Sequence, residues 1–351
     1  MESLFELLEA RDCARCLFLS DRSSGLRALA VLDDLTLGPA VGGTRTRAYA
    51  SLTSAFEDAA ALARAMTIKC ALGGLDAGGA KIVVIDHPGM AGTNRPRAFA
   101  RLGQLIDELD GLVRTAGDLG TTAEDVAIMG RHSSRVHVDE ADLSAATGRS
   151  VLGGVAACAA LKGREVAGLR VLVQGCGSIG AAVARALTAA DVEVWVTDID
   201  TARAERLAAE LGARVVAVED SLVSPCDVLS PCAVGGAITN DVAAAIQAWA
   251  VCGAANNILA DRASERRLMA RDILFVPDVI ASAGAVVDGV SRQVMGVRDA
   301  GERLARVDAL GTIAREVLEE SRRTGMPPTA VAHARAWARI HAKRDQLGRR
   351  A

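Results

Sequence analysis

The chain has few aromatic residues, no excess of positive charge and no long apolar run. Only 3% of its 351 residues are aromatic although 50% are hydrophobic. Its cores must therefore be built from alanine, valine, leucine and isoleucine, a mixture typical of parallel α/β sheets covered by alanine-rich helices. The formal net charge of −3 provides no basic surface for nucleic acid and no polybasic patch for a membrane. No apolar stretch approaches the roughly 20 residues that span a bilayer.

Signs of secretion and of a metal centre are also missing. The first residues are acidic where a signal peptide would be basic, and the eight cysteines are scattered, which predicts reduced thiols in a cytoplasmic protein. Cys13 and Cys16 form a C-x-x-C pair with no second pair at zinc spacing, and no histidine has ligand spacing. We therefore predict no metal site.

The length of 351 residues favours two domains.

Two lysines, Lys69 and Lys81, lie in a segment of otherwise small and apolar residues, reached through a predicted helix over 51–66. Lys81 follows a glycine-rich turn and precedes the strand-like run 82–85. Ammonium groups in such surroundings must pair, bind an anion or titrate at a lowered pKa. The alternative is that both lysines reach the surface with their stems against the core. Asp118, in a second run of small residues, is either functional or an ordinary turn or N-cap residue.

A strand, a glycine-rich turn and a helix follow one another between residues 169 and 187. The turn is G-x-G-x-x-G, and its glycines are Gly175, Gly177 and Gly180, with Ser178 and Ile179 between them. In the dinucleotide-binding motif the first glycine makes the turn, and the second lets backbone approach a pyrophosphate at the helix N-terminus. The third lets helix and strand pack closely.

The next predicted strand indicates which dinucleotide is bound. It covers 193–197 and ends at Asp198, 18 residues after Gly180. A carboxylate there would bind the adenosine ribose hydroxyls. Asp200 lies nearby and no basic residue directly follows the strand, so a 2′-phosphate would be repelled. We predict NAD rather than NADP.

Short strand-like runs continue the α/β alternation to residue 278. Each ends in small or polar residues, at the edge where an open parallel sheet binds its ligand. These residues include Cys232 and Ala233, Asn256 and Asn257, and 282–284. The two asparagines are alternatively ordinary turn formers. The last 25 residues predict one helix whose many basic residues form a solvated face.

Seven motifs, in order and with matching spacing over about residues 15–340, resemble the glutamate/leucine/phenylalanine/valine dehydrogenase family, most closely its leucine and phenylalanine branch. They are 37–45, 62–69, 78–81, 115–121, 175–180, 253–257 and 277–278. The resemblance implies an α/β fold of two domains with a cleft between them. Residues 1–145 plus 327–351 would bind substrate and form a homodimer or larger homo-oligomer. Residues 146–326 would form a Rossmann NAD-binding domain.

The resemblance also implies reversible oxidative deamination of an L-amino acid to the 2-oxo acid and ammonia, with NAD as cofactor. Lys81 resembles the catalytic lysine that polarises the water or carbonyl at the reacting carbon. Asp118 resembles the general acid/base that moves the proton to and from the amino nitrogen. The substrate carboxylate would be bound by Lys69 and the backbone of Gly42 and Gly43. Asn256 or Asn257 would hold the nicotinamide ribose or the amino group.

By the same resemblance, the substrate side chain would contact Val41, Ala116, Val286 and Gly289. Gly289 replaces a larger aliphatic residue of the family, which predicts room for a bulky or aromatic side chain. No lysine or serine is present in this lining to favour glutamate.

The chain departs from the family at three places. Ala80 replaces the third glycine before the catalytic lysine, and Ser282 begins a run that is Asn-Ala-Gly-Gly in relatives. Gly153 and Gly154 stand where relatives carry threonines at the start of the interdomain helix. These departures leave two alternatives open: an imine-forming enzyme that couples two metabolites, and a non-catalytic NAD-binding protein.

Overall fold

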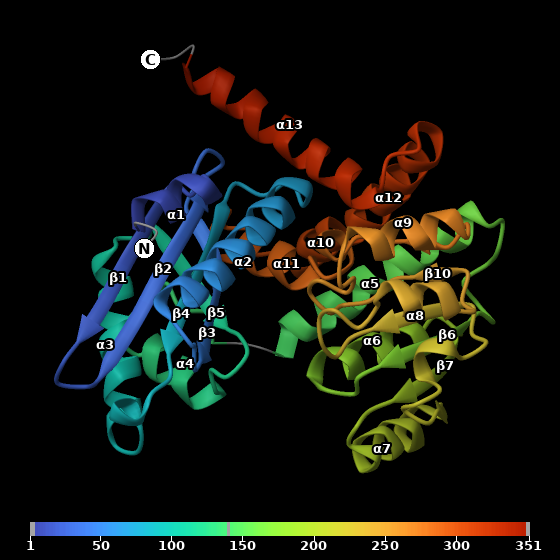
Figure 1. The fold of residues 1–351 in the computed structure, drawn as a ribbon, viewed down its shortest axis with the longest axis horizontal. Helices are drawn as coiled ribbons and strands as arrows, with labels where there is room; N and C mark the ends of the chain where they lie inside the picture. Colours follow the sequence, from blue (N-terminus) through green and yellow to red (C-terminus); the bar gives the residue numbers. More distant parts are fainter. Residues whose placement is uncertain (1–3, 139–140, 349–351) are drawn as a thin grey trace. The chain divides into compact units, whose positions relative to one another are not determined.

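The computed structural model describes residues 4–138 and 141–348. The chain divides into two compact units (Figure 1). The first comprises Met1–Glu140, Gln293–Gly296 and Trp337–Ala351, and the second comprises Ala141–Arg292 and Val297–Ala336.

The first unit is built on a five-stranded mixed sheet with the order β1-β2-β4-β3-β5. The strands are β1 (Arg15–Asp21), β2 (Leu26–Asp34), β3 (Ala40–Arg47), β4 (Gly78–Ile85) and β5 (Val113–Gly117). β1 and β2 form an antiparallel hairpin. β3 pairs in parallel with both β4 and β5, so the segments that carry Gly43, Lys81 and Asp118 lie side by side.

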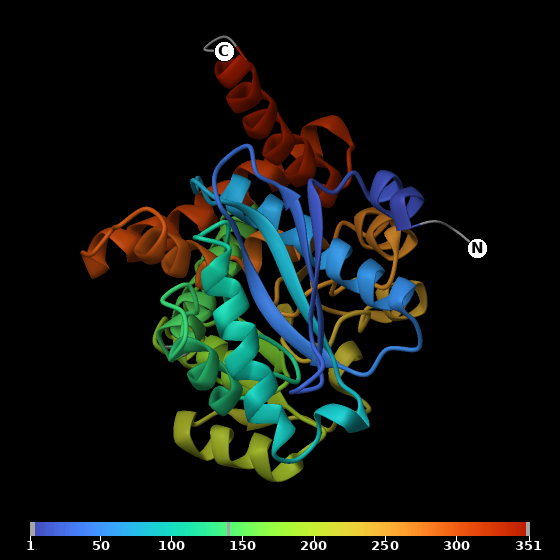
Figure 2. The ribbon, with the colours of Figure 1, turned by 90° about the vertical axis from the view of Figure 1, so that its left-hand side faces the viewer.

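Helices cover both faces of this sheet (Figure 2). On one face α2 (Leu52–Leu72) packs against Val31 and Val83, and on the other α3 (Asn94–Glu108) packs against Ile82 and Val84. The remaining helices of the unit are α1 (Leu4–Arg11), the 3-10 turn η1 (Pro88–Met90) and α4 (Ala123–Gly130). Val83 and its two neighbours contact opposite cores because side chains alternate along a strand.

Helix α2 is longer than the sequence predicted. It begins at the capping box of Ser51 and Ser54 and continues to Leu72. Lys69 therefore lies in the last turn of α2, and not in a separate segment after the helix. The β-branched residues Thr67 and Ile68 do not stop the helix, which continues until Gly73 ends it.

The departure at Ala80 is explained by this alternation. Added Cβ atoms at Gly78 and Gly79 would lie 1.7 Å from the carbonyl oxygen of Asp34 and 2.2 Å from that of Ala63. Glycine is therefore required at both positions. Ala80 points to the face opposite Gly79, where the residue is 1% exposed in the core beside α3. The third glycine of the family motif is thus dispensable in this chain.

We expect Ala80→Gly to destabilise the protein by about 1 kcal/mol, because a buried methyl is lost and the strand gains backbone entropy when unfolded. The kcat should stay near the wild-type value, since Ala80 lies on the face opposite Lys81. Chemical denaturation and steady-state kinetics test this expectation. A large loss of kcat in a folded Ala80→Gly variant would contradict it.

The second unit contains a six-stranded parallel sheet with the order β11-β10-β9-β6-β7-β8. Its strands are β6 (Arg170–Gln174), β7 (Glu193–Thr197), β8 (Arg214–Val215), β9 (Val228–Pro231), β10 (Ala250–Val251) and β11 (Leu274–Phe275). The strand order reverses between β6 and β9. Ligands of such sheets bind beyond the carboxyl ends of the strands at this reversal point, which here follows Gln174 and Pro231.

Helices complete the second unit. They are α5 (Ala141–Leu161), α6 (Ser178–Thr188), α7 (Thr201–Leu211), the 3-10 turn η2 (Ser221–Val223), α8 (Asn240–Ala245), α9 (Arg262–Ala270), α10 (Asp278–Ala281), α11 (Gly284–Gln293) and α12 (Ala300–Thr324). The tail forms one helix, α13 (Pro328–Gly348), as predicted. Its residues up to Ala336 belong to this unit and those from Trp337 onward to the first.

The expectation that Gly153 and Gly154 begin a helix is wrong. Both lie past the middle of α5. An added Cβ at Gly153 would lie 3.2 Å from the Cα of Gly311 in α12, and one at Gly154 would lie 2.6 Å from the Cys252 sulfur. Both glycines therefore permit close packing inside the second unit.

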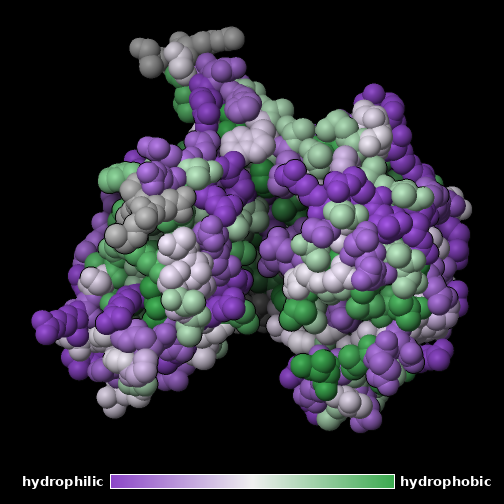
Figure 3. Space-filling model, viewed as in Figure 1, coloured by the Kyte–Doolittle hydropathy of each residue, from purple (hydrophilic) through white to green (hydrophobic). Residues whose placement is uncertain are grey.

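Hydrophilic and hydrophobic residues are interspersed over the visible face of each unit (Figure 3). Among the described helices, none combines the length and the apolar character required to cross a membrane.

Candidate active site

Strand alternation gathers the predicted catalytic residues of the first unit on the sheet face that α2 covers. Ala40, Ala80 and Val113 contribute to the opposite core. Side chains alternate between the two faces of a strand, so the residue that follows each of these points to the α2 face. Every second residue after that one points to the same face. This set comprises Val41, Gly43 and Arg45 of β3, Lys81 of β4, and Arg114 and Ala116 of β5, with Asp118 directly after β5.

Lys81 and Asp118 form an ion pair, with the ammonium nitrogen 2.8 Å from Asp118 Oδ2. The side chain of Lys81 is 7% exposed and that of Asp118 22%. The interpretation of Asp118 as an N-cap is wrong, because Thr122 caps α4. Nor does Lys81 extend to the surface, since its charged end is paired inside the unit.

The pair titrates away from the ordinary values of its members. Burial lowers the pKa of Lys81, and the attraction of Asp118 only partly opposes this effect. Burial by itself would raise the pKa of Asp118, but the positive charges of Lys81 and Arg45 together outweigh it and hold that pKa below its usual value. An ammonium that loses its proton more readily, next to a carboxylate, suits proton transfer near neutral pH.

Residues that the sequence did not predict hold Asp118 in its orientation. Arg45 donates from Nε to Asp118 Oδ2 at 2.8 Å, and its Nη1 lies 3.1 Å from both carboxylate oxygens of Asp58. The Tyr49 hydroxyl donates to Asp58 at 2.5 Å. Asp58 belongs to α2, so a helix and two strands together fix the orientation of Asp118. Arg45 is the last residue of the motif 37–45, so the sequence could have indicated it. Asp58 is one charged residue on a predicted helix, and no motif distinguishes it.

The backbone beside Lys81 is uncovered by side chains. An added Cβ at Gly43 would lie 3.0 Å from Asp118 Cβ and 3.1 Å from Lys81 Nζ, and one at Gly42 would lie 1.8 Å from the Ala80 carbonyl oxygen. Any larger residue at either position would displace the ion pair or the strand. The structure thus places the predicted Gly42 and Gly43 next to Lys81.

Lys69, 5% exposed, is held in place through the end of α2. The guanidinium of Arg339 in α13 donates to the carbonyl oxygens of Cys70, Ala71 and Leu75 at 2.9 to 3.2 Å. The carbonyl groups of Cys70 and Ala71 lie in the last turn of α2, and that of Leu75 lies in the segment directly after the helix. Arg339 is therefore a structural clamp, and the prediction that the basic residues of the tail form only a solvated face is wrong for it.

In the second unit the G-x-G-x-x-G turn has the geometry of a phosphate cradle. Gly175 has φ +98°, and an added Cβ at Gly180 would lie 1.8 Å from the Gly175 carbonyl oxygen. Gly177 precedes α6, has open space around it and caps the helix with no side chain. Ser178 and Ile179 form the first turn of α6, so amide groups at this N-terminus can bind an anion.

Asp198 lies at the end of β7 beside this turn. Its two oxygens accept backbone N–H groups, Oδ2 from Cys176 at 2.7 Å and Oδ1 from Asp200 at 2.8 Å. Burial alone would raise the pKa of Asp198, but these hydrogen bonds and Arg203 hold it low. Asp198 is therefore ionised and also shapes the glycine-rich turn. Arg203 lies 3.5 Å from Asp198 and 3.2 Å from Asp200.

The remaining predicted cofactor residues lie near the carboxyl ends of the central strands. Cys232 and Ala233 follow β9, and an added Cβ at Gly175 would lie 2.7 Å from that of Ala233. Asn256 and Asn257 follow β10 and are exposed. Asn257 has φ +53°, and its N–H donates to Asp278 at 2.8 Å. Asn257 is therefore a turn residue, and it lies at the edge of the sheet where parallel sheets bind their ligands.

Two further predicted residues, Val286 and Gly289, lie on α11 of the second unit and are partly exposed. Ser282, the departure next to this helix, ends α10 and donates its hydroxyl to the carbonyl oxygen of Asp278 at 2.7 Å. Ser282 therefore stabilises the turn that leads into α11.

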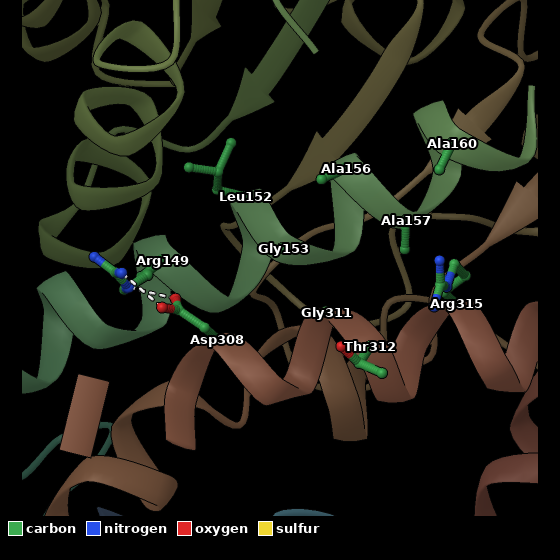
Figure 4. Close-up of a pocket in the computed structure, with 10 residues that line it drawn as sticks. All are labelled: Arg149, Leu152, Gly153, Ala156, Ala157, Ala160, Asp308, Gly311, Thr312 and Arg315. Atoms are coloured by element: carbon green, nitrogen blue, oxygen red, sulfur yellow. Dashed lines mark hydrogen bonds and ion pairs between the residues drawn. The ribbon is translucent and has the colours of Figure 1, made fainter. Parts of the chain in front are cut away.

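A separate open groove of about 510 Å³ lies between α5 and α12 (Figure 4). Gly153 and Gly311 meet at its floor, and Arg149 and Asp308 form an ion pair at one end. None of the predicted catalytic, substrate-binding or cofactor-binding residues lines it.

The chain is similar to known proteins over most of its length. Residues 15–135 match the family model described as Glu/Leu/Phe/Val dehydrogenase, dimerisation domain, and residues 200–293 match Glutamate/Leucine/Phenylalanine/Valine dehydrogenase. The chain is 34% identical to leucine dehydrogenase of Bacillus subtilis over 97% of its own length and 95% of that enzyme. It is 32% identical to phenylalanine dehydrogenase of Thermoactinomyces intermedius over 88% of its length and 86% of that enzyme.

The fold also resembles solved structures. L-tryptophan dehydrogenase from Nostoc punctiforme superimposes with a TM-score of 0.83 and 27% identity, over 97% of this chain and all of that one. Hetero-hexameric glutamate dehydrogenase from Thermus thermophilus has the same fold, with a TM-score of 0.78 and 24% identity over 94% of this chain and 89% of that one.

Proposed function

The chain belongs to the glutamate/leucine/phenylalanine/valine dehydrogenase family and is an amino acid dehydrogenase, and on that premise we propose that it oxidatively deaminates a bulky, largely apolar L-amino acid with NAD. The observation that carries this proposal is the buried ion pair of Lys81 and Asp118 beside the bare backbone of Gly43. The family membership favours this activity over an imine-forming enzyme or a non-catalytic NAD-binding protein.

In the proposed mechanism Lys81 and Asp118 are the catalytic residues. The Lys81 ammonium polarises the water, and then the carbonyl, at the reacting carbon. The Asp118 carboxylate takes a proton from the amino nitrogen and returns one to the departing ammonia. Lys69 and the amides near Gly42 and Gly43 bind the substrate carboxylate, which orients the reacting carbon. A bound nicotinamide supplies the hydride acceptor for this oxidation.

The second unit suits NAD as the cofactor. The N-terminus of α6 would bind the pyrophosphate, with Cys232 and Ala233 beside it and Asn256 or Asn257 toward the nicotinamide side. Asp198 and Asp200 place two carboxylates against the one guanidinium of Arg203, so the local charge disfavours a 2′-phosphate. We expect kcat/KM to favour NAD over NADP by about tenfold or more. Equal use of both would contradict the assignment.

The test is a spectrophotometric screen of L-amino acids with NAD and with NADP, together with measurement of NADH binding. Production of NADH and ammonia with at least one bulky amino acid is the expected result. Tight NADH binding without any reduction of NAD would exclude the dehydrogenase function.

Gly289 permits a prediction about side-chain size. We propose that it contacts the substrate side chain, along with Val286, Val41 and Ala116. Among the described residues, an added Cβ at Gly289 would meet only Leu143, at 3.4 Å, so α11 tolerates a larger residue. Gly289→Leu should therefore shift kcat/KM toward smaller side chains by about tenfold, and Val286→Ala should shift it the other way. An unchanged preference in the Leu variant would exclude Gly289 from the lining.

We also propose that the protein forms a homodimer or larger homo-oligomer in the cytoplasm. The match of residues 15–135 to a dimerisation domain supports the assembly. Light scattering coupled to size-exclusion chromatography tests it, and a monomer at all concentrations would contradict it.

A further inference from the structure

Arg114 places a positive charge beside the substrate face of the first unit. It lies on β5, two residues before Ala116, and its strand position points it to the α2 face. The register sets Arg114 beside Val41 of β3, which is itself beside Gly79 of β4. Arg114 is therefore a direct neighbour of both residues proposed above to contact the substrate side chain in this unit.

The guanidinium of Arg114 differs from the other partly buried arginines of the unit. Arg45, Arg64 and Arg95 each have a carboxylate oxygen within 2.8 Å. In contrast, Arg114 Nε is buried and has no hydrogen-bond partner within residues 4–138 and 141–348. A buried N–H without an acceptor is costly, so such groups are rare in proteins and require an explanation.

The neighbouring charges do not balance the positive charge of Arg114. Burial lowers its pKa, and repulsion from Arg135 lowers it further. Arg135 itself is bound only weakly, 3.8 Å from the fully exposed Asp110. The described part of the chain thus holds a guanidinium next to Val41 and Ala116 without supplying the acceptor that it requires.

We propose that Arg114 is a specificity-determining residue that donates a hydrogen bond to an oxygen near the end of the substrate's side chain. The inference rests on the proposed function and refines its substrate class. Val41 and Ala116 pack against the hydrocarbon part of the side chain, and Arg114 binds the oxygen beyond it. A carboxylate or a phenol provides this chemistry, and a pure hydrocarbon does not.

The test compares amino acids that are matched except for the oxygen. The pairs are L-tyrosine with L-phenylalanine, and L-2-aminoadipate with L-norleucine. In the wild type we expect kcat/KM to favour the oxygen-bearing member of at least one pair by about tenfold or more, because a charged donor left unpaired by the hydrocarbon opposes its binding. The favoured pair identifies the source of the oxygen as a phenol or a carboxylate.

Variants of Arg114 test whether this residue causes the preference for the oxygen-bearing substrate. Arg114→Leu should reduce that ratio to about one or invert it, whereas Arg114→Lys, which keeps a charged donor, should retain part of it. Arg135→Leu is the matched control on the neighbouring guanidinium and should leave the ratio unchanged. If Arg114→Leu does not fold, Arg114→Gln replaces it, with a reduced ratio again expected.

The outcomes separate this inference from the proposed function. Preference for the hydrocarbon members in the wild type, or an unchanged ratio in the folded Arg114→Leu or Arg114→Gln variant, would overturn the role of Arg114 while leaving the dehydrogenase function intact. No reduction of NAD or NADP with any amino acid, including those of the general screen, would instead overturn the function.

Discussion

Lys81→Ala is expected to lower kcat by about 10³-fold or more while the affinity for NADH stays within about twofold of the wild-type value. The ammonium is the buried positive charge next to the reacting position, paired at 2.8 Å with Asp118, and alanine supplies neither charge nor donor. NADH affinity should persist because the G-x-G-x-x-G turn belongs to the other unit. Steady-state kinetics and NADH fluorescence titration measure the two quantities.

Lys69→Ala is the matched control, since it removes an ammonium with nearly the same burial. If Lys69 binds the carboxylate, this variant should mainly raise KM, whereas Lys81→Ala should mainly lower kcat. Concurrent loss of NADH binding in a folded Lys81→Ala variant would mean that Lys81 has a structural role and not the one proposed.

Asp118→Asn is expected to lower kcat by about 10² to 10⁴-fold. The amide oxygen can still accept hydrogen bonds from Arg45, so the side chain keeps its place. It cannot take a proton from the amino nitrogen at neutral pH. Steady-state kinetics with a well-used substrate measure the effect, and a kcat within a few-fold of the wild type would exclude Asp118 as the general acid/base.

The residual activity of Asp118→Asn should also have a shifted pH profile. In the wild type burial lowers the pKa of Lys81, and Asp118 opposes that effect. Removing the carboxylate removes the opposition, so the pKa of Lys81 falls further and the limb of kcat/KM due to Lys81 moves to lower pH. Asp58→Asn is the control: Asp58 contacts Arg45 and not Lys81, so the shift should have the same direction and be smaller. An equal shift in both variants would contradict the direct pairing.

The secondary structure was predictable where one local signal dominates. The strand β7 and the turn that starts α6 both follow the sequence closely. Predictions failed where packing overrode the local signal. Helix α2 continues through Lys69 because β2 and β4 pack against its length, and Gly153 lies inside α5 because α12 approaches it closely.

The sequence by itself determined the family, the dinucleotide-binding turn and the identities of Lys69, Lys81 and Asp118, because each is part of a motif with fixed spacing. Only the tertiary structure decided which residues act on them. Arg45, Asp58 and Arg339 affect the two lysines or Asp118 from other elements, and Arg114 lies on their face through strand register. The spacing of a motif depends on residues that are close in sequence. Charge pairing and burial depend on groups that are far apart in sequence and that only folding brings together.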